Sequence, residues 1–104
     1  HMHNPYYDPE KLGCKSISFE QGMEYEFDTF LVLVSEDGRV FQTTDSGCSS
    51  PTPFDGYQGE SVEKCGMEQI HSMDRLMELL TAWQAKPCTE ERSELMAFTS
   101  KYLK

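Results

Sequence analysis

The sequence predicts an α+β fold, in which a small antiparallel sheet carries two C-terminal helices packed on the sheet. Residues 25–45 have strand patterns on both sides of a turn signal, which is typical of a β-hairpin. Two amphipathic segments follow, at about 73–86 and 90–103. The 104 residues suffice for one core, so we interpret residues 1–104 as a single domain, with His1 as the remnant of an expression tag.

The N-terminal segment is predicted to form a short helical turn followed by a strand. It reads NPYYDPEKLG over residues 4–13. Asp8 is a suitable N-cap, Pro9 suits the first helical position, and Gly13 can end the turn because it tolerates positive φ. Residues 17–19 are then expected to form a short strand.

The strongest strand signal in the chain is the segment YEFDTFLVLV, residues 25–34. Its first half alternates between aromatic and acidic side chains, so we expect cover on one side. Its second half is apolar throughout, which predicts cover on both sides. Asp37 and Gly38 favour a two-residue hairpin turn, since both residue types tolerate positive φ. The return strand is expected over residues 39–45.

The C-terminal part of the chain predicts a short edge strand and the two helices. Residues 61–72 have the pattern of a turn followed by an edge strand. Ser72 is a suitable N-cap for the helix at 73–86, whose apolar residues recur at helical spacing. Thr89 can cap the second helix, at 90–103.

The net charge is −9 at pH 7, and all of it comes from the middle of the chain. Residues 20–63 contain ten acids and one base, Arg39, whereas the charges elsewhere cancel. This pattern argues against direct binding to nucleic acid or to an anionic membrane, because either surface needs basic residues. An acidic face can instead mimic DNA and occupy the DNA site of another protein. The acids expected to form this surface are Glu24, Glu26, Asp28, Glu36 and Asp37.

A long, ordered loop is predicted after the hairpin, and it is the candidate partner-binding site. Residues 43–57 read TTDSGCSSPTPFDGY, and turn-forming residues dominate from residue 46 onward. Prolines and an Asx-type turn restrict the backbone, so the loop would lose little entropy when a partner binds. Phe54 and Tyr57 are suitable surface anchors, and the alternative is that both rings fold back as a lid on the sheet. The residues assigned to this site are Asp45, Ser46, Gly47, Cys48, Pro51, Pro53, Phe54 and Tyr57.

No motif supports catalysis or a metal centre. The four cysteines lack the C-x-x-C spacing of zinc sites, and no secretory signal is expected before them. Free thiols in a reducing cytoplasm are therefore predicted, without metal or cofactor. Cys48 and His71 are the one pair that could supply a nucleophile and its base, if the fold brings them together. We assign no catalytic residue, and a cysteine-dependent enzyme is the third hypothesis for function.

Two motifs resemble a known group of proteins. NPYYDPEKLG and TDSGCSSPTPF, joined by the hairpin YEFDTFLVLVSEDGRVF, are similar to an uncharacterised family of short proteins encoded mostly by actinobacterial phages and prophages. The similarity spans roughly residues 4–57 and implies a phage-type accessory protein rather than any activity.

The first hypothesis for function is a non-enzymatic module that binds a host or phage protein in the bacterial cytoplasm, as an inhibitor or modulator. DNA mimicry by residues 20–63 is the alternative. No apolar run reaches the length of a membrane span, so no membrane association is expected, and the oligomeric state stays open.

Overall fold

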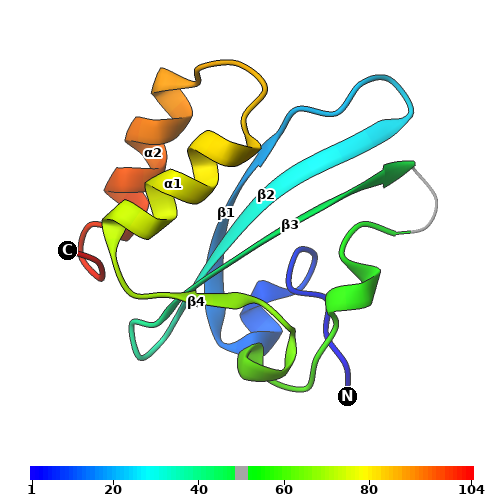
Figure 1. The fold of residues 1–104 in the computed structure, drawn as a ribbon. Coiled ribbons are helices and arrows are strands. Elements are labelled where there is room, and N and C mark those ends of the chain that lie inside the picture. Colours follow the sequence, from blue (N-terminus) through cyan, green and yellow to red (C-terminus); the bar gives the residue numbers. More distant parts are fainter. Residues whose placement is uncertain (49–51) are drawn as a thin grey trace.

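The computed structural model describes residues 1–48 and 52–104 and shows a four-stranded antiparallel sheet with two helices (Figure 1). Neighbouring strands in the sheet are also neighbours in the chain, in the order β1-β2-β3-β4. The predicted α+β fold is confirmed. The strand bounds are Cys14–Glu20 for β1, Glu26–Ser35 for β2, Val40–Cys48 for β3 and Glu68–Ile70 for β4.

Two α-helices and three short 3-10 helices complete the described part of the chain. Both α-helices lie on the same side of the sheet, and the 3-10 helices lie in the connections on the other side (Figure 1). The bounds are Met73–Trp83 for α1, Thr89–Thr99 for α2, Pro9–Leu12 for η1, Asp55–Tyr57 for η2 and Val62–Lys64 for η3.

The helix caps agree with the sequence pattern at α1 and differ at α2. The side chain of Ser72 accepts a hydrogen bond of 3.1 Å from the backbone N–H of Arg75, as expected of an N-cap serine. At α2 the N-cap residue is Cys88, whose side chain makes no capping bond, so the predicted cap at Thr89 is wrong by one residue. Both helices also end earlier than predicted. After α1 the chain is already extended at Gln84.

The sheet is covered on both faces, and the second half of β2 is buried between them, as predicted. The helix face packs against α1 and α2, while the opposite face, here called the lid face, lies beneath the N-terminal segment and residues 52–67. The buried core of the helix face consists of Phe19, Phe30, Val32, Val34, Val40, Ile70, Leu76, Leu80, Leu95 and Leu103. The buried core of the lid face consists of Cys14, Leu31, Leu33, Phe41, Phe54 and Val62.

The turn between β2 and β3 has three residues, so the predicted two-residue turn is wrong. The backbone N–H of Ser35 donates to the carbonyl of Arg39 over 2.9 Å, which leaves residues 36–38 as the loop. Within this loop only Gly38 has positive φ, at 83°. This arrangement suits a three-residue hairpin loop, in which one glycine takes the left-handed position.

The strands also differ from prediction at their ends. β1 and β3 are longer than expected, and β2 begins at Glu26 because Tyr25 has a φ of 65° and belongs to a turn. That turn is closed by the backbone N–H of Glu26, which donates to the carbonyl of Met23 over 3.0 Å. In the described part of the chain, every helix is too short or too polar to span a bilayer.

Candidate functional site

The loop predicted as a binding epitope is in large part a lid on the sheet. Phe54 is fully buried, and its ring centroid lies 5.4 Å from that of Tyr6 and 5.8 Å from that of Tyr57. The expectation that Phe54 reaches the surface is therefore wrong. The reason is that the apolar lid face of β2 and β3 needs cover, and Phe54 fills it together with the N-terminal segment.

Polar contacts hold this lid in place. The Asp45 carboxylate accepts hydrogen bonds from the backbone N–H of Ser46 over 3.0 Å and from that of Phe54 over 2.7 Å. Asp45 therefore bonds amides ahead of it, as predicted, but not in the Asx-type turn that was expected, which joins residues two positions apart. The Asn4 amide donates to the carbonyl of Pro53 over 2.9 Å. Tyr57 is partly exposed, and its hydroxyl lies 3.4 Å from the carbonyl of Thr44.

The other residues assigned to the loop differ from Phe54 in location and exposure. Ser46, Gly47 and Cys48 are exposed and belong to the end of β3 rather than to a loop. Pro53 serves as the acceptor for Asn4. Pro51 lies outside the described residues.

Strand register brings part of the predicted acidic surface to the end of β3. Glu26 pairs with Cys48 and Asp28 with Ser46, and Phe27 between them pairs with Gly47. We call this end of the sheet, residues 21–28 and 46–48, the distal tip. It combines two sets of residues that the sequence suggested separately.

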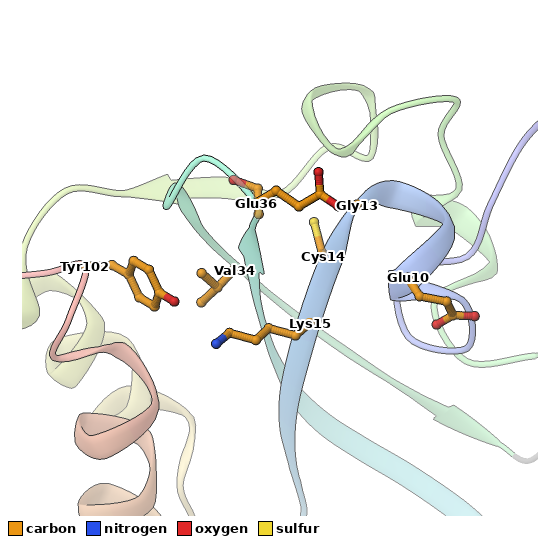
Figure 2. Close-up of a pocket in the computed structure, with 8 residues that line it drawn as sticks. Glu10, Gly13, Cys14, Lys15, Val34, Glu36 and Tyr102 are labelled. Atoms are coloured by element: carbon orange, nitrogen blue, oxygen red, sulfur yellow. The ribbon is translucent and has the colours of Figure 1, made fainter.

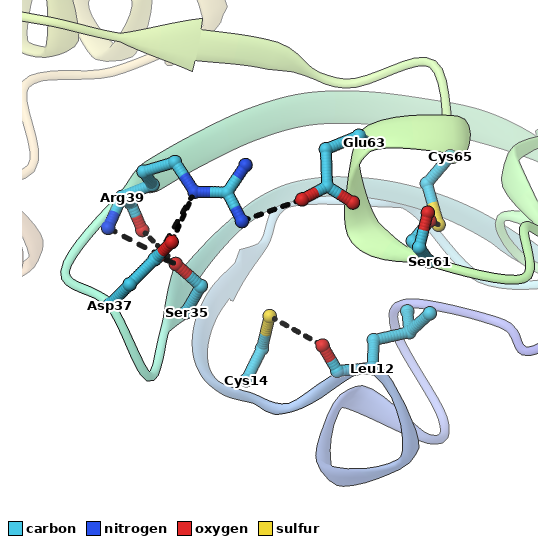
Figure 3. Close-up of polar contacts among 8 residues, drawn as sticks. All are labelled: Leu12, Cys14, Ser35, Asp37, Arg39, Ser61, Glu63 and Cys65. Carbon is cyan, nitrogen blue, oxygen red and sulfur yellow. Dashed lines mark hydrogen bonds and ion pairs between the residues drawn. The ribbon is translucent and has the colours of Figure 1, made fainter.

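The remaining acids of the predicted surface lie at the opposite end of β2, so the five acids do not form one face. Glu36 and Asp37 occupy the β2–β3 turn, and Asp37 pairs with Arg39 over 2.9 Å. A hydrogen bond from the Ser35 hydroxyl, together with Arg39, lowers the pKa of Asp37 to about 2. Arg39 also pairs with Glu63 over 2.6 Å, so this end of the sheet holds its own counter-charge (Figure 3).

The base of the distal tip is fixed by two side chains. The Glu20 carboxylate accepts from the backbone N–H groups of Gly22 and Asp28, over 2.8 and 2.9 Å, and from the hydroxyl of Thr29. The Gln21 amide donates to the carbonyl of Trp83 over 2.8 Å. These contacts attach the tip to the C-terminal end of α1.

The distal tip carries the two most exposed large apolar side chains of the described residues. The exposed fraction is 76% for Met23 and 79% for Tyr25. Next to them, the ring of Phe27 lies against Gly47, where a Cβ atom would come within 3.3 Å of it, beside an open hollow of about 380 Å³. The sequence does not indicate Met23 and Tyr25 as site residues, because Tyr25 fits the alternating pattern of the strand that follows it and no motif includes Met23.

The buried thiols do not have the environment of a nucleophile. The Sγ atoms of Cys14 and Cys65 lie 3.4 Å from the carbonyls of Leu12 and Ser61 (Figure 3). Burial, with a smaller effect of the neighbouring Cys65, raises the pKa of Cys14 to about 11, and burial also raises the pKa of Cys65. Both groups are therefore neutral thiols at pH 7.

The one nucleophile–base pair suggested by the sequence does not meet. His71 follows Ile70, which pairs with Val40 at the start of β3, whereas Cys48 is the last residue of β3. Strand residues rise about 3.3 Å each, so the two positions are on the order of 25 Å apart.

A further hollow of about 360 Å³ lies at the end of β1 near the C-terminus (Figure 2). Its charged side chains are Glu10, Lys15 and Glu36, and Lys15 extends towards the ring of Tyr102. Among the described residues, no cluster of three or more His, Cys, Asp or Glu side chains is arranged to hold a metal ion.

Comparison with known proteins identifies a family but no characterised relative. The family model described as "Domain of unknown function (DUF7574)" matches residues 3–103, which includes both helices as well as the N-terminal half. No curated protein matches the chain, and neither does any solved structure.

Proposed function

The chain belongs to the family described as a domain of unknown function (DUF7574), and we propose that it is a non-enzymatic protein-binding module. We propose the distal tip as its contact surface. The observation that carries this proposal is the exposure of Met23 and Tyr25, at 76% and 79%, on a connection whose base is held by Glu20 and Gln21.

Such a surface is suited to binding a protein. Tyrosine is enriched among the residues that dominate interface energies, and methionine adapts to irregular apolar partners. The hydrogen bonds of Glu20 and Gln21 order the tip before a partner arrives, so less conformational entropy is lost on binding. The partly exposed ring of Phe27 extends the apolar area.

The acidic residues support DNA mimicry less well than the exposed apolar residues support protein binding. A mimic needs several unpaired carboxylates on one face, spaced like phosphates. Here Asp28 accepts from Trp83, and Asp37 pairs with Arg39. The remaining acids of the predicted surface are Glu24, Glu26 and Glu36, which lie at two ends of the sheet.

We further infer, from the resemblance of the N-terminal half, that the module is a phage-type accessory protein that inhibits or modulates a host protein in the bacterial cytoplasm. The neutral, buried thiols of Cys14 and Cys65 and the separation of Cys48 from His71 support a role without catalysis.

The test is affinity capture from an actinobacterial lysate with Tyr25→Ala and Met23→Ala beside the wild type. The matched control is Tyr7→Ala, since Tyr7 is 54% exposed but lies on the N-terminal segment. We expect the wild type and Tyr7→Ala to retain the same protein, and Tyr25→Ala to lose it at an unchanged melting temperature. Retention of that protein by Tyr25→Ala and Met23→Ala would disprove the role of the tip.

A further inference from the structure

β1 is an outer strand of the sheet, and part of its free edge is open (Figure 1). In its pairing with β2, the backbone N–H of Gln21 donates to the carbonyl of Asp28 over 3.0 Å. Because bonded pairs alternate along antiparallel strands, the odd-numbered residues of β1 bond to β2. The N–H and C=O groups of Ser16 and Ser18, both exposed residues, therefore point away from the sheet.

At the other edge of the sheet the outer strand is β4, which has only three residues, and other residues of this chain cover the edge of β3 beyond it. β4 pairs with Val40–Gln42 at the start of β3. Further along, the hydroxyl of Tyr57 contacts the carbonyl of Thr44, and the carboxylate of Asp45 accepts from the N–H of Ser46. Among the described residues, nothing comparable bonds to Ser16 or Ser18. An uncovered edge of this kind can add a further strand.

Acidic hollows flank β1 at both ends. The acids among the residues that line the hollow of Figure 2 are Glu10 and Glu36, and the Glu10 carboxylate is directed away from the other labelled side chains. The one ammonium of this hollow, Lys15 Nζ, lies 5.5 Å from the ring centroid of Tyr102 and 5.7 Å from that of Phe98, so it is directed towards the helix side rather than along the edge.

The second hollow, of about 310 Å³, lies between the far end of β1 and α2. Three carboxylates line it without any base, and the rings of Phe19 and Trp83 form its apolar part. An aliphatic stem of lysine or arginine can lie along such rings while its charged group reaches the carboxylates. The three acids are Glu20, Glu91 and Glu94. The Glu20 carboxylate already accepts from the N–H groups of Gly22 and Asp28, so a basic side chain would meet chiefly Glu91 and Glu94.

We propose that the free edge of β1 binds an extended, basic segment of a partner protein as a fifth strand of the sheet. Backbone hydrogen bonds to Ser16 and Ser18 supply the pairing, and lysine or arginine side chains at alternate positions reach the two acidic hollows. This surface is separate from Met23 and Tyr25, so the proposal does not depend on the apolar contact of the distal tip.

The acidic residues at the two ends of β1 favour a basic segment over a second copy of the chain as the added strand. Antiparallel pairing of two β1 edges would bring the end that carries Glu20, Glu91 and Glu94 against the end that carries Glu10 and Glu36. Like charges placed opposite each other disfavour that pairing. A basic segment meets carboxylates at both ends.

The probe is a short synthetic peptide in which lysine alternates with threonine, and binding is measured by calorimetry at low salt. We expect binding to slow hydrogen exchange at the amides of Ser16 and Ser18. The matched control peptide has the same charge but carries N-methyl groups on alternate backbone amides, which removes the donors that strand pairing needs. We expect it to bind about tenfold more weakly or worse.

Two substitutions test the same edge from the side of the protein. Ser18→Pro removes an outward N–H without removing a bond to β2, a position where an edge strand tolerates proline. Its control, Ser18→Thr, keeps the backbone donor. We expect about tenfold weaker binding for Ser18→Pro and no change for Ser18→Thr, with Trp83 fluorescence reporting that both variants are folded.

The outcomes separate this proposal from the proposed function. Equal binding of both peptides, protection of the distal tip instead of β1, or no binding to the wild type would overturn it. Tyr25→Ala is expected to bind the peptide as the wild type does, even though it fails in lysate capture. The proposal for the distal tip and the proposal for the edge of β1 can thus be disproved independently.

Discussion

The indole Nε1 of Trp83 donates a hydrogen bond of 2.8 Å to Oδ1 of Asp28, which joins the last residue of α1 to the part of β2 at the distal tip. The other carboxylate oxygen of Asp28 accepts from the Gln21 amide over 2.9 Å. Asp28 therefore belongs to the structure that holds the tip, although the sequence suggested it as part of an acidic binding surface.

Asp28→Ala is expected to destabilise the protein by about 1–3 kcal/mol, because it leaves the partly buried indole N–H without its acceptor and removes one of the two acceptors of the Gln21 amide. Urea unfolding followed by the fluorescence of Trp83 measures this loss. Glu26→Ala is the control, since Glu26 is exposed on the same strand, and we expect it to change stability little. Equal stability of the two variants would show that Asp28 is not a structural acceptor.

The burial of Phe54 gives a second prediction. Phe54→Ala should cost about 3–5 kcal/mol, as for other core aromatic residues, because it opens a cavity between Tyr6 and the sheet. Tyr57→Ala should cost less, because that ring is only partly buried. Tyr25→Ala should leave the melting temperature unchanged. A Phe54→Ala variant as stable as the wild type would contradict the lid assignment.

The hairpin and the helices were predictable because their signals are local. The continuous apolar run at the end of β2, the glycine at position 38 and the cap at Ser72 each act within a few residues of the chain. The distal tip was not predictable in this way. It depends on the register that pairs Glu26 with Cys48, and on the contact of Gln21 with the end of α1.

The burial of Phe54 likewise cannot be predicted from the residues next to it in the chain. Its sequence context of proline and glycine is typical of an exposed loop. Its burial is decided by Asp45, which accepts from its N–H, and by Tyr6, which stacks on its ring from the N-terminal segment. Tyr6 lies outside the loop and nothing in the loop's own sequence implies that contact, so the alternatives of epitope and lid could not be separated from the sequence.

The four cysteines are predicted to differ in reactivity towards a thiol reagent such as a disulfide-exchange dye. Cys48 is exposed and should react first in the native protein at pH 8. Cys88 should react more slowly, because a hydrogen bond with Glu91 raises its pKa and lowers its thiolate fraction. Cys14 and Cys65 are buried and should react only on unfolding. The variants Cys48→Ala and Cys88→Ala show which cysteine gives the faster and which the slower reaction in the native protein. Rapid reaction of all four cysteines would contradict the burial of Cys14 and Cys65.

The raised pKa of Cys14 predicts a loss of stability at high pH. Burial raises that pKa from 9.0 to about 11, so between these values the unfolded chain gives up a proton that the folded chain keeps. Unfolding then releases a proton, and the free energy of unfolding falls as the pH rises from about 9 to about 11. A shift of this size corresponds to roughly 2–3 kcal/mol at most.

Cys14→Ala isolates this contribution from the other groups that titrate in the same range. The difference in unfolding free energy between the wild type and Cys14→Ala should be constant below pH 9 and should narrow between pH 9 and 11, as measured by urea unfolding at each pH. Cys48→Ala, which removes an exposed thiol, is measured in the same way as the control for the loss of one cysteine. A constant difference between the wild type and Cys14→Ala up to pH 11 would mean that the Cys14 thiol ionises as easily in the folded protein as in the unfolded chain.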